Sequence, residues 1–345
     1  MKYIAFTTKG IEKIAKKEIN HEFPDSTIID SRVKTILFET DAKLKELSTL
    51  KTVDDLCIWV REIDNLPNSK KAIDIISSSL KKIKVKGIIS KLNSYREVKP
   101  NSFSITVGVY KTKYCSKELK KSLAEILASN RKWKYTSHNH DNLDIRISVT
   151  KNEAVLGIRA TENSLHRRKY KKYSKKGSLR ATIAAAMVLE AIDHKKNLKI
   201  VDNFCGSGTI LCEALLTRNK VYGGDIDKES INITKQNLSN IRRDNYDIKH
   251  LNATKTSWQS NFFDCAISNL PWDKQIKIDK LTTLYSKAII EYKRILNPNS
   301  TICLLGVKPD FLVSQIKKIF NYRNIKIIKL GYLGQNPSMV VAKAG

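Results

Sequence analysis

Acidic residues are scarce in this 345-residue sequence, which has 34 Asp and Glu against 63 Lys and Arg and a net charge of +29. Such an excess predicts a polyanionic partner, and because no amphipathic membrane anchor is visible, nucleic acid is favoured over lipid. Long apolar runs are also missing: none approaches the roughly 20 residues that cross a bilayer, and the opening MKYIAFTTKG lacks the apolar core of a signal peptide. We therefore expect a cytoplasmic protein with no membrane partner.

Paired cysteines are missing too. The six cysteines include no C-x-x-C pair and follow no regular His/Cys spacing. This disfavours a zinc site or a disulfide framework and predicts reduced thiols buried as small hydrophobic groups. His138 and His140 in SHNH have a metal-like spacing, but no Cys or acidic residue is patterned nearby, so a solvated loop is favoured. We expect no bound metal.

The densest run of positive charge is HRRKYKKYSKKGSLR, residues 166–180, with eight Lys and Arg, two tyrosines and no acidic residue. It has no apolar face at a helical or strand period, so we expect a solvated connector. Its cations can neutralise phosphates and its tyrosines can lie against sugar or base, although a plain charged linker is the alternative. The predicted RNA-binding residues are Arg167, Arg168, Lys169, Tyr170, Lys171, Lys172, Lys175 and Lys176.

Two kinds of pattern meet at this connector. Before it, strand-like segments at 28–40, 102–110 and 143–160 mix with a helical pattern at 116–130, which predicts an α+β region. After it, helical and apolar segments alternate to the end of the chain. This alternation predicts an α/β fold, a doubly wound and mostly parallel seven-stranded sheet with helices on both faces. Ligands of such sheets bind beyond the carboxyl ends of the strands.

A glycine-containing turn, DNFCGSGT, follows the first strand of the α/β region. Gly206 and Gly208 lack the Cβ atoms that would keep a ligand from the backbone, and the helix expected from Thr209 points its amide groups at the same space. A single G-x-G is weak evidence, but its place between a strand and a helix indicates a cofactor loop.

The second strand ends in GGDID. Asp225, 19 residues beyond Gly206, can accept hydrogen bonds from both ribose hydroxyls of a nucleoside cofactor, whereas Asp227 is placed to cap the next helix. The loop has Leu211 where a dinucleotide fingerprint needs glycine, and it has no Walker lysine, so S-adenosylmethionine fits better. Asn252, after the third strand, is expected at the adenine. The predicted cofactor residues are Asp202, Phe204, Cys205, Gly206, Ser207, Gly208, Thr209, Asp225, Ile226, Asn252, Ala253 and Asn269.

DNFCGSGTILCEAL, GGDID and NLPW, in this order and spacing, resemble the motifs of class I S-adenosylmethionine-dependent methyltransferases. Residues 157–191 are similar to the joining segment of the THUMP-domain-containing tRNA (guanine-N(2)-)-methyltransferases. The resemblance covers residues 150–310 and, more loosely, the N-terminal region. It implies tRNA as the partner. It also implies four parts: a small ferredoxin-like module at 1–55, a THUMP RNA-binding domain at 56–160, a basic linker at 161–180 and a Rossmann-like methyltransferase domain at 181–345.

The sequence departs from the family pattern at three positions. Asn203 stands where proline is usual, Lys169 where glycine is usual, and Asn252 where aspartate is usual. The amide oxygen of Asn252 can still accept the adenine amino hydrogen. This replacement therefore puts the affinity for the cofactor in question more than the identity of the cofactor.

SNLPW, residues 268–272, is the predicted reacting site. An exocyclic purine amine is a poor nucleophile because its lone pair is delocalised into the ring, but two acceptors against its N–H groups can turn that lone pair toward an electrophilic methyl. We expect Asn269 Oδ1 and the Leu270 carbonyl to be these acceptors, Pro271 to stiffen the turn, and Trp272 to stack on an extruded base. Because Asn269 is neutral, catalysis would depend on positioning and not on a general base. An ordinary strand-to-loop exit is the alternative.

The leading hypothesis is N(2)-methylation of a tRNA guanosine at position six of the acceptor stem, with position ten as a rival. An adenine-N(6) methyltransferase acting on RNA or DNA and a catalytically inactive RNA-binding protein are the alternatives. Leu270, in place of the first proline of the adenine tetrad, favours guanine. Asp273 is expected either to contact the guanine edge or to be a solvated charge. The oligomeric state is left undetermined.

Overall fold

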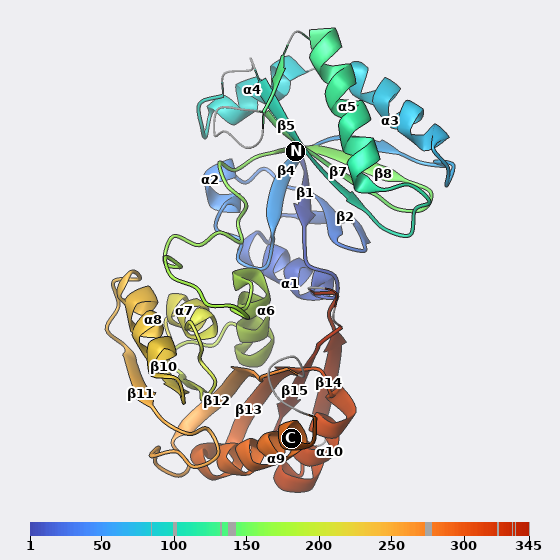
Figure 1. Cartoon of the computed structure of the whole chain (residues 1–345). Helices are drawn as coiled ribbons and strands as arrows, with labels where there is room; N and C mark the ends of the chain where they lie inside the picture. The colour runs from blue at the N-terminus through green and yellow to red at the C-terminus, as the bar shows by residue number, and fades with distance from the viewer. Residues whose placement is uncertain are drawn as a thin grey trace. The chain divides into compact units, whose positions relative to one another are not determined.

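The computed structural model describes residues 1–83, 85–98, 102–131, 133–136, 143–272, 278–322, 324–332, 334 and 336–344. By its internal contacts the chain forms two compact units (Figure 1). The first contains Met1–Thr7 and Ile19–Leu165, and the second contains Thr8–Glu18 and His166–Gly345. The predictions made for His138, His140 and Asp273 lie outside the described residues.

The first unit contains an eight-stranded sheet with the order β2-β3-β1-β4-β8-β7-β5-β6 among the described residues. The strands predicted at 28–40, 102–110 and 143–160 and the helix predicted at 116–130 are confirmed. Helix α1 (Glu12–Glu22) begins in the second unit and ends in the first. The remaining elements are β1 (Lys2–Phe6), β2 (Thr27–Arg32), β3 (Thr35–Glu39), α2 (Leu44–Leu47), β4 (Asp55–Ile63), α3 (Lys71–Lys81), α4 (Val85–Asn93), β5 (Ser102–Val109), α5 (Ser116–Arg131), β6 (Lys134–Tyr135), β7 (Leu143–Val149) and β8 (Ala154–Arg159).

Strand β4 connects the two parts of this sheet because it pairs antiparallel with β1 on one side and with β8 on the other. Asp55, buried at the start of β4, accepts a hydrogen bond from Arg159 Nε of β8 at 3.0 Å and pairs with Arg146 of β7. The sheet therefore continues from the predicted ferredoxin-like module into the predicted THUMP domain. The predicted boundaries of these parts stay predictions.

The second unit is an α/β sandwich whose seven-stranded sheet has the order β11-β10-β9-β12-β13-β15-β14. The strands are parallel except β15, which pairs antiparallel with both β13 and β14, so the predicted mostly parallel sheet is confirmed. The elements are α6 (Ala181–Ile192), β9 (Lys199–Asp202), α7 (Thr209–Leu216), β10 (Lys220–Asp225), α8 (Lys228–Ser239), β11 (Tyr246–His250), β12 (Phe263–Asn269), α9 (Ile278–Ile295), β13 (Leu296–Gly306), α10 (Pro309–Phe320), β14 (Asn324–Lys329) and β15 (Ser338–Lys343).

The central strands of this sheet send successive side chains into two different hydrophobic clusters. Cys265 and Ile267 of β12 pack in the cluster that includes α6, α7 and α8, whereas Ala266 packs in the cluster that includes α9 and α10. Ile200 and Val201 of β9 divide in the same way. Because helices cover both faces, these strands are continuous apolar runs without a polar face.

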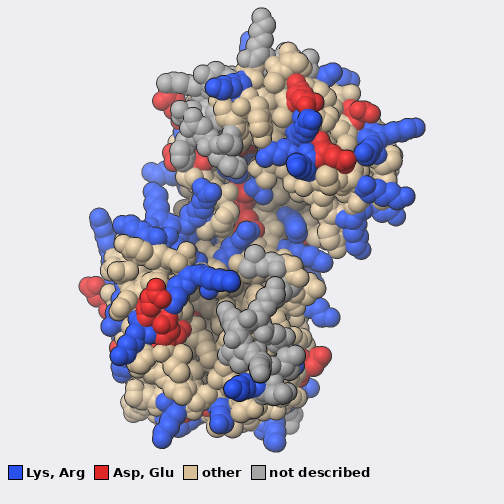
Figure 2. Space-filling model, viewed as in Figure 1, with Lys and Arg blue, Asp and Glu red and all other residues tan. Residues whose placement is uncertain are grey.

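Lys and Arg outnumber Asp and Glu on the surface of both units in the view of Figure 2, as the net charge of +29 requires. All six cysteines are free; five are buried as predicted, but Cys115 is exposed beside the start of α5, so the prediction is wrong for this thiol. Among the described residues no helix is both long and apolar enough to span a bilayer. The predicted cytoplasmic location stays a prediction.

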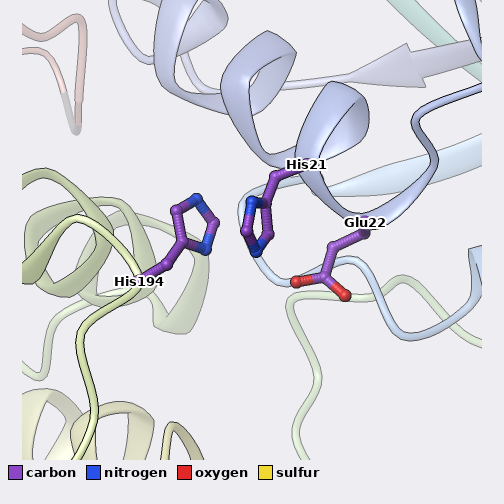
Figure 3. A group of neighbouring side chains, drawn as sticks. All are labelled: His21, Glu22 and His194. Atoms are coloured by element: carbon purple, nitrogen blue, oxygen red, sulfur yellow. The ribbon is translucent and has the colours of Figure 1, made fainter.

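Helix α1 ends in two polar residues, His21 and Glu22, whose side chains Figure 3 draws together with that of His194. His194 follows α6 and has a left-handed backbone with a φ of 62°, as does Asp193 before it with a φ of 47°. Two successive left-handed residues turn the chain sharply out of α6 toward β9.

Candidate active site

The turn after β9 has the open backbone that its sequence predicts, but its two glycines serve different purposes. Gly206 has a φ of 53°, and a Cβ atom there would meet no described residue within 4 Å apart from its two chain neighbours. Gly208 has a φ of 76°, and its Cβ would lie 2.8 Å from Thr234 Cγ2 on α8. Gly208 is therefore required by packing and by its left-handed backbone. The expectation that both glycines make room for a ligand stays a prediction. Helix α7 begins at Thr209 as predicted.

The two aspartates of GGDID have different partners, and the ribose role expected of Asp225 stays a prediction. Asp227 caps α8, accepting the backbone N–H groups of Glu229 and Ser230 at 3.3 and 3.0 Å, so its predicted capping is confirmed. Asp225 accepts the N–H of Gly206 at 2.9 Å on Oδ2 and the N–H of Asp227 at 3.0 Å on Oδ1. The carboxylate of Asp225 thus fixes the cofactor loop to the end of β10 and keeps further lone pairs for a ligand.

The predicted adenine side of the site contains one exposed apolar side chain and one amide that is engaged locally. Ile226 is 70% exposed at the end of β10. Asn252 uses its Oδ1 to accept the N–H and the hydroxyl of Thr254 at 3.0 and 2.9 Å, and Ala253 between them is buried. The oxygen that was expected at the adenine is therefore occupied within its own turn, whereas Ile226 offers an apolar surface on which a base can lie.

A buried chain of hydrogen bonds joins the end of β9 to the end of β12. Ser268 donates its hydroxyl to Asp202 Oδ1 at 2.6 Å, and the hydroxyl of Tyr292 on α9 lies 2.6 Å from Ser268 Oγ. Tyr292 also accepts the N–H of Asn203 at 3.2 Å. Burial raises the pKa of Asp202 to about 7, although the bonds from Ser268 and from the Phe204 amide oppose this rise. Asp202 therefore titrates near neutral pH.

Asn269 is the last residue of β12, and its side-chain oxygen is one of the two acceptors predicted for the amine. Its Oδ1 is buried and has no hydrogen-bond partner among the described residues. The N–H of Leu270 donates to the carbonyl of Leu305 on β13 at 2.9 Å, so the backbone that carries the predicted acceptors is fixed to the sheet. A buried acceptor without a partner is costly, and a ligand N–H group would satisfy it.

The rest of the NLPW turn is held by tyrosines. The carbonyl of Pro271 accepts the hydroxyl of Tyr285 on α9 at 2.6 Å. Trp272 is partly buried, and its ring meets that of Tyr332 edge to face with centroids 6.4 Å apart. The turn is therefore positioned by contacts from α9 and from the segment after β14. The roles predicted for its four residues stay predictions.

The basic connector is not the solvated segment that its composition predicts, because part of it is folded against α7. Glu213, which is 1% exposed, accepts hydrogen bonds on Oε1 from Arg168 Nε at 2.8 Å and from the Tyr170 hydroxyl at 2.6 Å. Lys171 donates to the carbonyl of Leu179 at 2.6 Å, and its burial lowers the pKa of its ammonium to about 8. These three side chains anchor the connector, and the prediction of a solvated segment is wrong for them.

Other predicted RNA-binding residues remain accessible. Lys175 forms ion pairs with Asp227 and with Glu229, the latter at 2.8 Å. Tyr173 is 49% exposed. The cations whose side chains are exposed are Arg167, Lys169, Lys172 and Lys176.

Sequence reasoning overlooked three residues of this site. Glu213 had a visible signal, since it is the one acidic residue inside the apolar helix TILCEALL. Tyr292 and the buried Asn237 of α8 had none, because a tyrosine or an asparagine in an amphipathic helix gives no indication of which loop it reaches.

Asn203, which departs from the family pattern, accepts the indole N–H of Trp258 on its Oδ1 at 3.0 Å.

The strand order, the glycine turn after β9 and the NLPW turn after β12 together define a Rossmann-like methyltransferase domain. Residues 168–333 match the family model described as the RMKL-like methyltransferase domain. The resemblance drawn from the sequence motifs is confirmed for this domain.

Three curated relatives have related names. A tRNA (guanine(6)-N2)-methyltransferase of Thermus thermophilus is 29% identical over 54% of this chain and 56% of its own length. The tRNA (guanine(6)-N(2))-methyltransferase THUMP3 of Bos taurus is 24% identical over 90% of this chain and 56% of its own length. The U6 snRNA (guanine-N(2))-methyltransferase THUMPD2 of Bos taurus is 32% identical over 50% of this chain and 34% of its own length. The chain thus spans little more than half the length of the first two relatives and about a third of the length of the third.

Solved structures share the fold over the whole chain. TrmN from Thermus thermophilus superposes with a TM-score of 0.78 at 20% identity, covering all of this chain and 99% of the other. SMU.472, a putative methyltransferase complexed with SAH, superposes with a TM-score of 0.71 at 16% identity, covering all of this chain and 98% of the other. Identities this low show the fold, and this confirms the predicted architecture.

Proposed function

We propose that this protein transfers a methyl group from S-adenosylmethionine to N(2) of a guanosine in tRNA, at position six of the acceptor stem. The observation that carries the proposal is the Oδ1 of Asn269 at the carboxyl end of β12, which is buried and has no hydrogen-bond partner in the described part of the chain. It can accept one hydrogen of the guanine 2-amino group, and the carbonyl of Leu270 can accept the other. Holding both hydrogens in this way directs the nitrogen lone pair out of the plane of the base.

The residues around the glycine turn fit the proposed cofactor. The open space beside Gly206 leaves room for a ligand against the backbone. The carboxylates of Asp202 and Asp225 can hold the ammonium and the ribose hydroxyls, and the exposed Ile226 can lie against the adenine. When bound, S-adenosylmethionine supplies an electrophilic methyl group on a sulfonium.

The names of the relatives support the substrate class. Two of them are named for guanosine six of tRNA and one for the guanine N(2) of U6 snRNA, so guanine is common to all three. Leu270 in the NLPW turn stands in place of the first proline of the adenine tetrad, and this favours guanine over adenine. The exposed cations Arg167, Lys169, Lys172 and Lys176 supply positive charge for the phosphates of a structured RNA.

The decisive experiment combines labelled S-adenosylmethionine with unmodified tRNA transcripts, followed by digestion and identification of the labelled nucleoside. We expect N(2)-methylguanosine. A matched transcript with inosine in place of guanosine six lacks the 2-amino group and should accept no label. Label retained in the inosine transcript would move the site to another nucleotide, position ten being the first to examine.

Other products would overturn parts of the proposal. Methyladenosine would replace guanine by adenine as the substrate. Label in a U6 snRNA transcript but in no tRNA would replace tRNA by snRNA as the substrate and leave the proposed methyl transfer to guanine N(2) unchanged. The absence of label in every RNA, with cofactor binding intact, would exclude the proposed transfer.

A further inference from the structure

Asn237 of α8 joins the basic connector to the cofactor loop. Its side chain is fully buried, and all three of its hydrogen bonds reach backbone atoms of these two segments. Its Nδ2 donates to the carbonyl of Tyr173 at 3.0 Å and to the carbonyl of Ser207 at 2.9 Å, while its Oδ1 accepts the N–H of Tyr173 at 3.2 Å. One amide therefore fixes a residue of the connector and a residue of the loop at the same time.

Two further contacts attach the connector beside the same loop. The hydroxyl of Ser178 lies 2.8 Å from that of Ser207. Lys175 pairs with Asp227 and Glu229, the first two acidic residues of the α8 cap region. The stretch from Tyr173 to Ser178 thus lies along the edge of the cofactor loop, with Lys172, Tyr173 and Lys176 exposed.

We propose that Asn237 is a positioning residue that couples RNA bound on the exposed side of the connector to the cofactor loop, so that each ligand raises the affinity for the other. The inference rests on the proposed function only in taking RNA and S-adenosylmethionine as the two ligands. It does not depend on which nucleotide is methylated.

The physical basis is the shared backbone. Phosphates bound by Lys172 and Lys176 hold the connector in the one conformation in which the N–H and the carbonyl of Tyr173 meet Asn237. With its amide held in this way, Nδ2 keeps the Ser207 carbonyl, and therefore the turn around Gly206, in place for the cofactor. Affinity changes between two ligands are reciprocal by thermodynamic linkage.

The test measures the Kd of S-adenosylhomocysteine, which cannot react, by calorimetry with and without a saturating tRNA transcript. For the wild-type protein we expect tRNA to lower this Kd by about 5-fold or more. In Asn237→Ala the ratio of the two values should fall most of the way to 1, because the three hydrogen bonds of this amide to the two segments are lost and only the Ser178–Ser207 contact still joins them, while S-adenosylhomocysteine alone binds several-fold more weakly.

Asn219→Ala is the matched control. Asn219 is also buried, and its amide also makes three hydrogen bonds to loops, with Leu198, Thr217 and Lys195, but it precedes β10 at the amino end of the sheet. The loss of stability should be similar in the two variants, as measured by thermal unfolding, whereas Asn219→Ala should keep the wild-type ratio.

Ser178→Ala provides a second variant that does not depend on a buried substitution. It removes the hydroxyl contact with Ser207 at a partly exposed position, and it should reduce the ratio part of the way toward 1. Equal ratios in the wild type, Asn237→Ala and Ser178→Ala would overturn the proposal, as would a wild-type protein with no coupling or with no affinity for the transcript. A protein that couples the two ligands but forms no methylguanosine would keep this inference and refute the proposed function.

Discussion

Ser268 donates a hydrogen bond of 2.6 Å to Asp202, and this bond connects the strand that leads into the cofactor loop with the strand that ends in Asn269. Both residues are buried, and Ser268 immediately precedes Asn269 in the chain. The position of the predicted catalytic amide is therefore tied to a carboxylate whose pKa is about 7. A change in the charge of Asp202 therefore alters the hydrogen bond of Ser268, the residue next to Asn269.

Asp202→Asn should stabilise the protein more at pH 8 than at pH 5. Burial raises the pKa of Asp202 from 3.8 in the unfolded chain to about 7 in the folded protein. The folded state therefore binds the proton more tightly, and the stability contributed by Asp202 is present below pH 4 and lost as the pH rises to 7. Between pH 5 and pH 8 the stability lost in this way is on the order of 3 kcal/mol. Denaturant unfolding of wild type and variant at both pH values measures it, and a difference independent of pH would refute the prediction.

Ser268→Ala should extend to higher pH the range over which stability is lost as Asp202 ionises. The serine hydroxyl favours the ionised form of Asp202, so its removal raises the pKa of the carboxyl further and costs about 2 kcal/mol of stability. Ser300→Ala is the control, because Ser300 is also buried and its hydroxyl lies 2.8 Å from that of Tyr322, and within the described residues it has no hydrogen bond to a carboxylate. A pH profile of unfolding that shifts equally in both variants would contradict the assignment.

Asn269→Ala should abolish turnover with little change in binding. The amide oxygen acts on the amine as the methyl group is transferred, so we expect the rate to fall by about 100-fold or more. The Kd values for S-adenosylhomocysteine and for tRNA should stay within about 3-fold of wild type, since the amide is a small part of each interface. Single-turnover methylation and calorimetry separate the two effects. Wild-type turnover in this variant would remove Asn269 from the catalytic site.

Arg168→Ala and the double variant Lys172→Gln with Lys176→Gln should affect different properties. Arg168 pairs with the buried Glu213, so its loss leaves an uncompensated carboxylate and costs about 3 kcal/mol of stability. Replacing the two exposed lysines should leave stability unchanged. It should weaken tRNA binding and reduce the salt slope of the affinity by about 1 for each lysine removed.

The control for the lysine pair is Lys195→Gln with Lys196→Gln, which removes the same charge from exposed positions after α6. It should leave the salt slope close to wild type. An equal loss of tRNA affinity in both double variants would mean that only the net charge of the protein matters.

Ile226→Ser should weaken the binding of the cofactor without lowering the stability of the protein. Ile226 is 70% exposed, so its replacement should change stability by less than about 0.5 kcal/mol, but it removes the apolar surface proposed for the adenine and should raise the Kd of S-adenosylhomocysteine roughly 10-fold. Ile290→Ser, at a position 57% exposed on α9, is the matched control and should bind as the wild type does. Equal Kd values in the two variants would place the adenine elsewhere.

Local patterns in the sequence were sufficient for the elements of the second unit. Strands such as β12 and β15 are short, mostly apolar runs, and Asp227 caps α8 through the backbone amides of residues that directly follow it. The packing reason for Gly208 was not visible in the sequence, because the atom that its missing Cβ avoids, Thr234 Cγ2, is supplied by another helix. A sequence pattern shows that a position needs glycine, but it does not show what lies opposite.

The sequence by itself determined the succession of strands and helices along the chain, the place of the glycine turn and of NLPW at strand ends, and the excess of positive charge. All of these follow from local composition and spacing. Only the tertiary structure decided which polar groups are buried and with whom they pair. Arg168 and Tyr170 meet Glu213, which is more than 40 residues away in the chain. The pKa of Asp202 likewise depends on its burial beside Ser268, 66 residues further on. Burial and pairing depend on atoms that the fold brings together, and no local pattern records them.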